Sequence, residues 1–193
     1  MNSLWDEPGV ASYIEGFWDS PGEVALRQDV ANWIGPQQGK SLLDVGCGSG
    51  RMYLLLQDCL YTGMDGSQEM LKLARERAPQ ATFLQADILA SSLPCADKAY
   101  DVALCMHVMR HLPGYEKLLV ELARAVREGV FVVDAFHSEG PHSFATSDVA
   151  NQTFLENSWS LPIFLADVAV AFPGWRITSD NLSGVIGVRI IAP

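Results

Sequence analysis

Residues suited to binding a nucleotide-like ligand gather at the end of the first apolar run. Gly46, Gly48 and Gly50 alternate directly after residues 42–45, and Asp44 stands near the end of that run. Glycine adopts a positive φ in a tight turn, and its missing side chain lets a ligand approach the backbone. The pattern predicts a nucleotide-type site at the carboxyl end of a parallel strand.

The spacing of the glycines separates three known binding patterns. The dinucleotide fingerprint G-x-G-x-x-G needs its third glycine at the position that Arg51 occupies. A phosphate-binding P-loop needs G-x-x-x-x-G-K-S/T after a strand. The run GPQQGKS over residues 35–41 is one residue short of that pattern and precedes the strand. The pattern that fits is D-x-G-x-G-x-G over residues 44–50.

A second carboxylate, Asp65, follows the next apolar run over residues 60–64. It comes about 20 residues after the first strand, where nucleotide-binding α/β folds place the carboxylate that binds ribose hydroxyls. Ionised Asp accepts hydrogen bonds, and a vicinal diol donates two. The structural alternative is a turn residue in the sequence DGS over residues 65–67.

The histidines cluster late in the chain, at His107, His111, His137 and His142. His107 directly follows the apolar run 100–106, and His137 comes shortly after the run 130–134. Ligands bind at this rim in open α/β sheets, and the pKa of histidine suits proton transfer. We therefore expect His107 and His137 as a general base or substrate contacts, with a hydrogen-bonded structural role as the alternative for each.

Alternating elements must position these residues. We expect helices over residues 21–34, 51–57, 70–79, 113–127 and 161–172, and strands over residues 42–45, 60–64, 81–85, 100–106, 130–134, 175–178 and 185–191. Such alternation predicts right-handed crossovers and a Rossmann-like, doubly wound α/β sheet of seven strands with helices on both faces. The last two strands have no helix between them, which predicts an antiparallel edge.

Two segments depart from this alternation. Residues 137–160 lack periodicity and are expected to form a long loop. Residues 1–20 mix aromatic with acidic side chains. They are expected to form an N-terminal arm that covers an apolar edge or acts as a lid over the ligand site. Ser20 and Glu23 have the spacing of a capping box at the start of the next helix.

Length and composition indicate one globular domain over residues 1–193, because the chain is 49% hydrophobic and 19% charged. The net charge of −10 disfavours nucleic-acid binding, which depends on Lys and Arg. The four cysteines lie far apart, so neither a metal site nor a disulfide framework is indicated. No signal peptide or membrane-spanning run is visible. We expect a cytoplasmic protein with a small-molecule substrate and no membrane partner; the oligomeric state is left open.

The run LDVGCGSG over residues 43–50 resembles motif I of the class I S-adenosylmethionine-dependent methyltransferases. Leu93-Pro94 and the run AYDVAL over residues 99–104 are similar to the L-P … F-D-V-V segment of the small-molecule branch. That branch includes the methyltransferase type 11 and quinone-biosynthesis enzymes. The resemblance implies methyl transfer from S-adenosylmethionine to an oxygen, nitrogen or carbon atom of a small molecule. It also implies the sheet order 3-2-1-4-5-7-6 with strand seven antiparallel.

The resemblance further implies a cofactor site made of five parts. They bind the methionine portion, the ribose, the adenine amine, the purine faces and the surroundings of the sulfonium. In that order the residues are Asp44, Gly46, Cys47 and Gly48; Asp65 and Gly66; Asp87; Met70 and Ile88; Cys105 and Met106. Arg27 and Arg110 are candidates for pairing with a carboxylate of the cofactor or of an acidic substrate.

Two other functions stay open. One is a nicotinamide-dependent oxidoreductase, which the glycine spacing and the lack of a second nucleotide-binding half disfavour. The other is a partner subunit that binds S-adenosylmethionine without catalysis.

Overall fold

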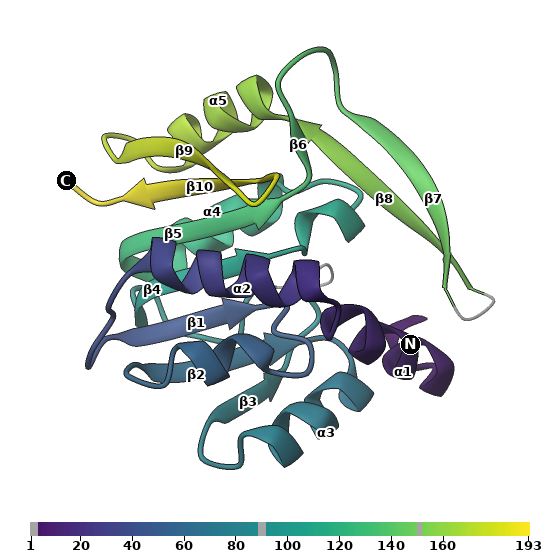
Figure 1. Cartoon of the computed structure of the whole chain (residues 1–193). Helices are drawn as coiled ribbons and strands as arrows, with labels where there is room; N and C mark the ends of the chain where they lie inside the picture. Colours follow the sequence, from purple (N-terminus) through teal and green to yellow (C-terminus); the bar gives the residue numbers. More distant parts are fainter. Residues whose placement is uncertain (1–3, 89–91, 150–151) are drawn as a thin grey trace.

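The computed structural model describes residues 4–88, 92–149 and 152–193 (Figure 1). Its centre is a seven-stranded sheet in the order β3-β2-β1-β4-β5-β10-β9. The strands are β1 (Ser41–Val45), β2 (Leu60–Asp65), β3 (Thr82–Gln85), β4 (Tyr100–Met106), β5 (Val126–Asp134), β9 (Arg176–Leu182) and β10 (Val185–Ile191). The first five are parallel, and β10 is antiparallel to both its neighbours. The predicted fold class, strand order and antiparallel edge are confirmed.

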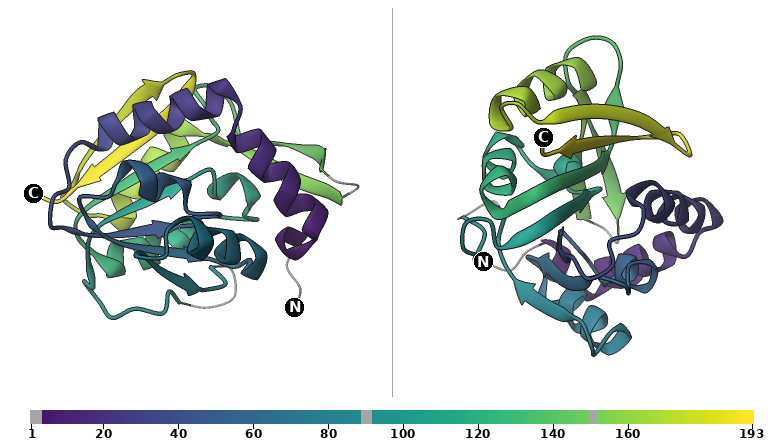
Figure 2. Two further views of the ribbon diagram at one scale, coloured as in Figure 1. Left: turned by 60° about the horizontal axis from the view of Figure 1, so that its bottom comes forward. Right: turned by 90° about the vertical axis from the view of Figure 1, so that its left-hand side faces the viewer.

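Helices cover both faces of this sheet (Figure 2). One face carries α2 (Pro21–Ile34), η2 (Arg51–Leu55) and α3 (Gln68–Arg77); the other carries α4 (Glu116–Ala125) and α5 (Leu161–Ala171). Successive residues of β4 point to opposite faces, so Cys105 packs toward α4 and α5 while Met106 packs toward α2. Because both faces are covered, the central strands are apolar runs, which is why the sequence identified them.

A small second sheet replaces the long loop predicted over residues 137–160. It contains β6 (Phe136–His137), β7 (Ser143–Val149) and β8 (Gln152–Ser160), in the order β6-β8-β7. β7 and β8 pair antiparallel as a hairpin that projects from the main sheet (Figure 1). The loop prediction was wrong because β7 is mostly exposed. Backbone pairing with β8 holds it, so no buried face imposes an alternating pattern on its sequence.

The N-terminal arm is helical. It consists of η1 (Leu4–Asp6) and α1 (Pro8–Trp18), beside the carboxyl ends of the parallel strands (Figure 2). Residues 1–3 of the predicted arm, and Leu89 after the third strand, lie outside the described residues.

Several element boundaries differ from the prediction, most clearly the one between α4 and β5. α4 ends at Ala125, and β5 begins at Val126 rather than at residue 130. The Lys98 ammonium donates to the carbonyls of Ala123 and Val126 at 2.9 and 2.8 Å, which satisfies acceptors at the helix end. At the start of α2, Ser20 makes no side-chain capping bond, so the predicted capping box does not form.

Candidate active site

The glycine loop (residues 46–50) joins β1 to η2. The φ angles of Gly46, Gly48 and Gly50 are 71°, 51° and 73°, in the left-handed region that favours glycine. A Cβ atom on Gly46 would lie 2.3 Å from the Val108 side chain, whereas one on Gly48 would meet nothing within 4 Å. The loop is therefore tightly packed at its base and open at Gly48.

Asp65 connects the end of β2 to this loop. One carboxylate oxygen accepts the backbone N–H of Gly48 at 2.8 Å, and the other accepts that of Ser67 at 2.8 Å. Burial raises the pKa of Asp65, and the backbone hydrogen bonds oppose that rise. Each oxygen keeps a second lone pair, so a ligand hydroxyl can still donate to the same carboxylate.

Asp44 is a buried carboxyl group under the loop. It is 2% exposed and accepts a hydrogen bond from the Tyr61 hydroxyl. Burial raises the pKa of Asp44 to about 7, although the Tyr61 hydrogen bond acts in the opposite direction. Its carboxyl group therefore changes between ionised and protonated forms near neutral pH.

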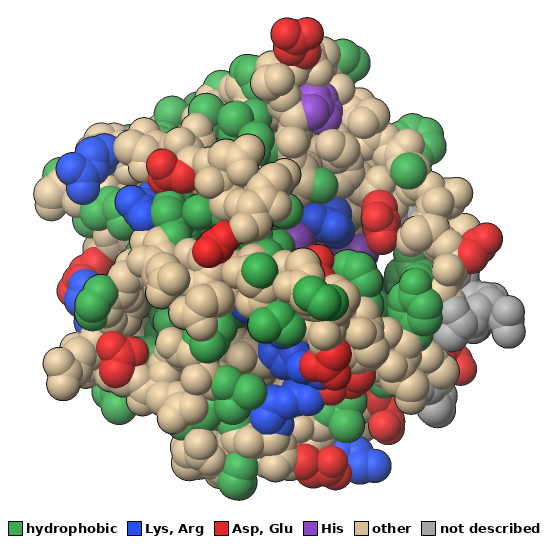
Figure 3. Space-filling model, in the orientation of Figure 1, with side chains coloured by type: hydrophobic (Ala, Val, Ile, Leu, Met, Phe, Trp, Pro, Cys, Tyr) green, Lys and Arg blue, Asp and Glu red, His purple; other side chains and the backbone are tan. Residues whose placement is uncertain are grey.

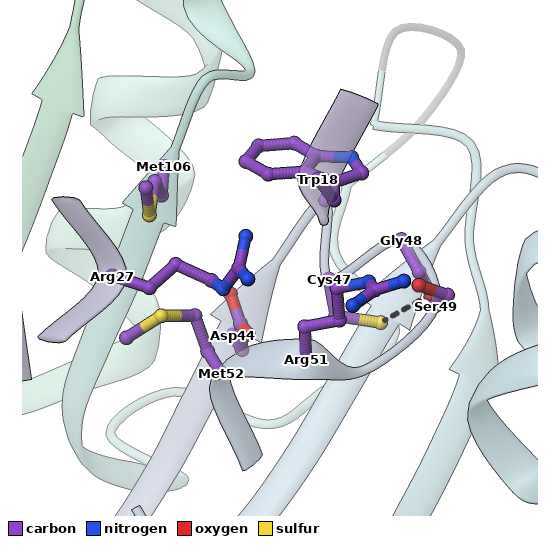
Figure 4. Close-up of a pocket in the computed structure, with 10 residues that line it drawn as sticks. Trp18, Arg27, Asp44, Cys47, Gly48, Ser49, Arg51, Met52 and Met106 are labelled. Atoms are coloured by element: carbon purple, nitrogen blue, oxygen red, sulfur yellow. Dashed lines mark hydrogen bonds between the residues drawn. The ribbon is translucent and has the colours of Figure 1, made fainter. Parts of the chain in front are cut away.

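A pocket lies against the loop (Figure 4). Its lining residues are Trp18, Arg27, Asp44, Gly46, Cys47, Gly48, Ser49, Arg51, Met52 and Met106. Figure 4 shows the Trp18 ring above the pocket and the Arg27 guanidinium reaching into it. Arg27 is 7% exposed, and its Nη1 has no hydrogen-bond partner in the structure.

Ten of the eleven predicted cofactor residues fall into two groups. Those that line the pocket are Asp44, Gly46, Cys47, Gly48 and Met106. Those that follow β2 and β3, at the same edge of the sheet, are Asp65, Gly66, Met70, Asp87 and Ile88. The structure does not bring Cys105 to the pocket. It is 0% exposed and faces α4 and α5, because neighbouring strand residues point to opposite faces.

Half of the pocket lining was not predicted as a cofactor site. Arg27 was noted as a candidate partner of a carboxylate, but Ser49, Arg51 and Met52 were not singled out. The sequence feature that could have identified these three residues is their position beside Gly48 and Gly50. Trp18 lies in the arm, and no local pattern connects it to the loop.

His107 is held in an unusual conformation next to the pocket. It directly follows the pocket residue Met106, and its φ is 57°, which is uncommon for a residue with a side chain. Its Nδ1 lies 2.6 Å from the Arg110 Nη2, and the Arg110 Nε donates to Asp134 at 2.8 Å. Trp18 packs over the imidazole with ring centroids 5.5 Å apart.

The other predicted catalytic histidine, His137, does not line the pocket. Its Nδ1 lies 2.7 Å from the Glu139 carbonyl oxygen, and its Nε2 lies 3.1 Å from that of Ser158. Both ring nitrogens thus face backbone oxygens, one between β6 and β7 and the other in β8. This arrangement matches the structural alternative for His137.

The arm and the hairpin together form a roof, defined here as residues 4–18, 143–149 and 152–160. Val10 and Phe154 share a small apolar cluster, and the Trp5 ring packs on Phe154 at 4.7 Å. On the other side, Glu15 accepts from Arg51 and Arg77 at 2.9 and 2.5 Å. The roof therefore extends from the hairpin to the glycine loop.

Polar contacts complete the attachment of the roof. Ser49 of the glycine loop donates to Glu15. The Trp5 carbonyl accepts from the Ser67 hydroxyl at 3.0 Å, and Asp6 accepts the Gln68 N–H at 2.9 Å. These last bonds lie at the β2–α3 turn, next to Asp65.

Within residues 4–88, 92–149 and 152–193, no cluster of His, Cys, Asp and Glu could hold a metal ion. Across the same ranges, no helix combines the length and apolar character needed to cross a membrane. All four cysteines are free thiols.

Sheet order, antiparallel β10, the glycine loop after β1 and the carboxylate at the end of β2 together define the class I methyltransferase architecture. Residues 43–133 match the family described as "Methyltransferase domain". This match and these features support a class I S-adenosylmethionine-dependent methyltransferase of the small-molecule branch.

Two curated relatives are similar to this chain. O-methyltransferase rstn1 of Aspergillus nomiae is 30% identical over 144 residues, covering 65% of this chain and 63% of the relative. The 27-O-demethylrifamycin SV methyltransferase of Amycolatopsis mediterranei is 27% identical, covering 67% and 51%. The chain thus spans between 51% and 63% of the length of these relatives.

Two solved structures show the same fold. A SAM-dependent methyltransferase from Aquifex aeolicus has a TM-score of 0.69 at 20% identity, covering 95% of this chain and 98% of that one. Magnesium protoporphyrin IX methyltransferase from Synechocystis PCC 6803, solved with bound SAM, has a TM-score of 0.71 at 17% identity, covering 98% and 93%.

Proposed function

We propose that this protein transfers a methyl group from S-adenosylmethionine to a small-molecule acceptor. One observation carries the proposal: the open backbone at Gly48, the Asp65 carboxylate and the Arg27 guanidinium, whose Nη1 has no hydrogen-bond partner, lie at the carboxyl edge of the sheet. Ligands bind at this edge in open α/β sheets. The match of residues 43–133 to the methyltransferase family supports the same conclusion.

The residues around the pocket fit the polar groups of this cofactor. Arg27 offers a buried cation to the methionine carboxylate. Asp44 and the loop backbone suit the ammonium group, and Asp65 suits the ribose diol. Asp87 would bind the adenine amine. When bound, the cofactor supplies an electrophilic methyl group on a sulfonium, and the chain's own residues orient the acceptor toward it and exclude water.

We further propose that residues 1–193 act as one domain in which residues 1–20 serve as a lid. The net charge of −10 supports a small-molecule acceptor rather than a nucleic acid. Four free thiols support a reducing compartment, such as the cytoplasm.

Cofactor identity is tested by titrating the full chain with S-adenosylmethionine, S-adenosylhomocysteine and NAD in a thermal-shift assay. The first two ligands should raise the melting temperature and NAD should not, since a ligand stabilises only the state that binds it. Stabilisation by NAD alone would favour the oxidoreductase instead. Release of methyl label to any member of a small-molecule library separates an enzyme from a non-catalytic partner subunit.

Arg27→Met tests the proposed contact between Arg27 and the methionine carboxylate of the cofactor. Loss of a hydrogen bond to a charged group should weaken S-adenosylmethionine binding by roughly 1.5–3 kcal/mol. Because Arg27 Nη1 is buried without a partner, the variant should be no less stable than the parent protein. The exposed Lys72→Met on α3 is the matched control and should bind normally. Unchanged calorimetric affinity in Arg27→Met would remove Arg27 from the site.

A further inference from the structure

Two buried polar atoms without partners face each other beside the pocket. They are Oε2 of Glu23 and Nε2 of His107, which lie 3.8 Å apart. Glu23 is one turn before Arg27 on α2, and His107 follows Met106, so each is next to a residue of the pocket lining. In Figure 3, acidic, basic and histidine side chains gather in a hollow between α2 and the hairpin β7–β8. The pair itself is buried, and it adjoins the pocket through Arg27 and Met106.

The contact with Arg110 determines which nitrogen of His107 carries the hydrogen. A guanidinium group donates hydrogen bonds and cannot accept them. Arg110 Nη2 lies 2.6 Å from Nδ1 of His107, so Nδ1 must offer its lone pair. In the neutral imidazole the hydrogen then resides on Nε2. Arg110 is itself held by Asp134, which is 0% exposed, through Nε at 2.8 Å and the backbone N–H at 3.2 Å.

The imidazole of His107 is neutral. Burial, and then the nearby Arg110 cation, lower the pKa of His107 to about 4. The 3.8 Å contact with Glu23 is accordingly no salt bridge at neutral pH, and it is too long for a hydrogen bond. Nε2–H is a donor in need of an acceptor. It cannot serve as the proton acceptor that the sequence pattern suggested for His107.

Glu23 provides the second atom without a partner, a hydrogen-bond acceptor beside the His107 donor. Its Oε2 is buried without a partner. The charged groups that face it are Arg110 and Arg27, which favour the carboxylate, while burial raises the pKa of Glu23 more strongly. A buried polar group without a hydrogen bond costs about 1–3 kcal/mol. Two such groups side by side, one donor and one acceptor, point to a ligand group that satisfies both.

Resting on the proposed methyl transfer, we propose that Glu23 and His107 bind the acceptor's hydroxyl group and that Glu23 is the general base for O-methylation. One oxygen can reach both atoms, because 3.8 Å is shorter than twice a usual hydrogen-bond length of about 2.8 Å. The hydroxyl donates to Glu23 Oε2 and accepts from His107 Nε2–H.

The chemistry selects oxygen over nitrogen. A hydroxyl has one hydrogen and two lone pairs, so it can donate to Glu23, accept from His107 and still attack with the second lone pair. A neutral amine has a single lone pair, which the His107 hydrogen bond would occupy. In the transfer, the oxygen–methyl bond forms and the methyl–sulfur bond breaks. The bonding electrons of the latter stay on sulfur, giving a neutral thioether, and the hydroxyl proton moves to Glu23.

The first test reads the tautomer of His107 by 15N NMR of the histidine-labelled full chain. We expect a neutral Nε2–H imidazole at pH 7, and an Nδ1–H tautomer would overturn the proposal. Phenol at millimolar concentration, added with S-adenosylhomocysteine, should shift the Nε2 resonance in the parent protein and in Glu76→Gln, an exposed control on α3. The shift should be weaker in Glu23→Gln. Absence of any phenol-induced shift in the parent protein would also overturn the proposal.

The second test compares label transfer from S-adenosylmethionine to ring-matched phenols and anilines. Phenol methylation should exceed aniline methylation, and Glu23→Gln should lower it by about 10²–10⁴-fold, as for loss of a general base. Glu76→Gln should have no effect. Preference for anilines, or full activity of Glu23→Gln, would overturn the hydroxyl assignment. S-adenosylmethionine binding is measured by calorimetry in the same experiments. If the parent protein does not bind S-adenosylmethionine, the proposed function itself is contradicted. If it binds the cofactor but methylates anilines in preference to phenols, only this inference is contradicted.

Discussion

The glycine loop and the roof border the same space but are held in different ways. The loop is a short, continuous segment whose shape depends on positive φ angles at three glycines and on the Asp65 clamp. The roof joins two segments far apart in the chain, and its attachment depends on side chains such as Trp5 and Glu15. The family match over residues 43–133 includes the loop and leaves out the roof. The shape of the proposed cofactor loop is thus a property of local backbone, and enclosure of the pocket is a property of side-chain packing.

The pKa values of carboxyl groups in the two regions are shifted in opposite directions. Burial raises the pKa of Asp44 beneath the loop to about 7. At Glu15 in the roof, burial acts in the same direction, but hydrogen bonds from Ser49, Arg51 and Arg77 outweigh it and hold the pKa below its ordinary value. Ionisation of Glu15 therefore stabilises the roof, and this contribution is lost as pH falls below the ordinary value of 4.5.

The largest effect expected in this comparison comes from Gly48→Val. The valine side chain would enter the open space above the loop, at a φ of 51° that strains a β-branched residue. We expect cofactor binding to be lost while the fold survives. Gly140→Val, at a φ of 82° and also with open space, is the matched control outside the pocket. Both variants should lose similar stability, and normal S-adenosylmethionine binding by Gly48→Val in calorimetry would show that the loop is a mere turn.

Asp44→Asn tests the buried carboxyl through its pH dependence. The folded pKa of about 7 exceeds the ordinary 3.8, so the folded state holds more protons between these values. Stability should therefore fall as pH rises through this window, by on the order of 2–4 kcal/mol in total. Asparagine cannot titrate. In urea unfolding from pH 4 to 8 the difference between parent and variant should change across the window, and parallel profiles would contradict the raised pKa.

Asp65→Ala removes the clamp and the predicted ribose contact. We expect S-adenosylmethionine binding to weaken by roughly 1.5–3 kcal/mol, the range for hydrogen bonds to a charged group. Adenine alone, which has no ribose, should lose less affinity than the whole cofactor. Equal losses for both ligands in calorimetry would assign Asp65 to loop geometry rather than to the ribose.

Among the single substitutions, the smallest effect is expected from Glu15→Gln in the roof. Glu15→Gln weakens the ion pairs with Arg51 and Arg77, which are partly exposed and together contribute about 1 kcal/mol. Hydrogen exchange of residues 5–18 should speed up in the variant, and S-adenosylhomocysteine should slow it in both proteins.

Deleting residues 1–18 should leave a folded domain with weaker cofactor binding and little turnover. If the hydrogen-exchange rates of residues 5–18 do not change when S-adenosylhomocysteine is added, the arm is a fixed part of the core rather than a lid.

Much of the cofactor edge could be predicted because its signals are local. Alternating glycines require a turn with positive φ, and Asp65 follows an apolar strand at a set distance from the first. Cys105 was misplaced within the same region, since the sequence shows that a residue ends a strand but not which face of the sheet it meets. Strand β7 was missed because its mostly exposed residues carry no alternating pattern.

The sequence by itself determined the α/β alternation, the glycine loop and the carboxylate after the second strand, because each depends on backbone preferences of neighbouring residues. Tertiary structure alone decided that Trp18 covers the pocket and that Glu23 of α2 meets His107 after β4. It also decided the protonation of Asp44 and the hydrogen position on His107. Those properties arise from side chains distant in sequence, which the sheet order and burial bring into one low-dielectric space.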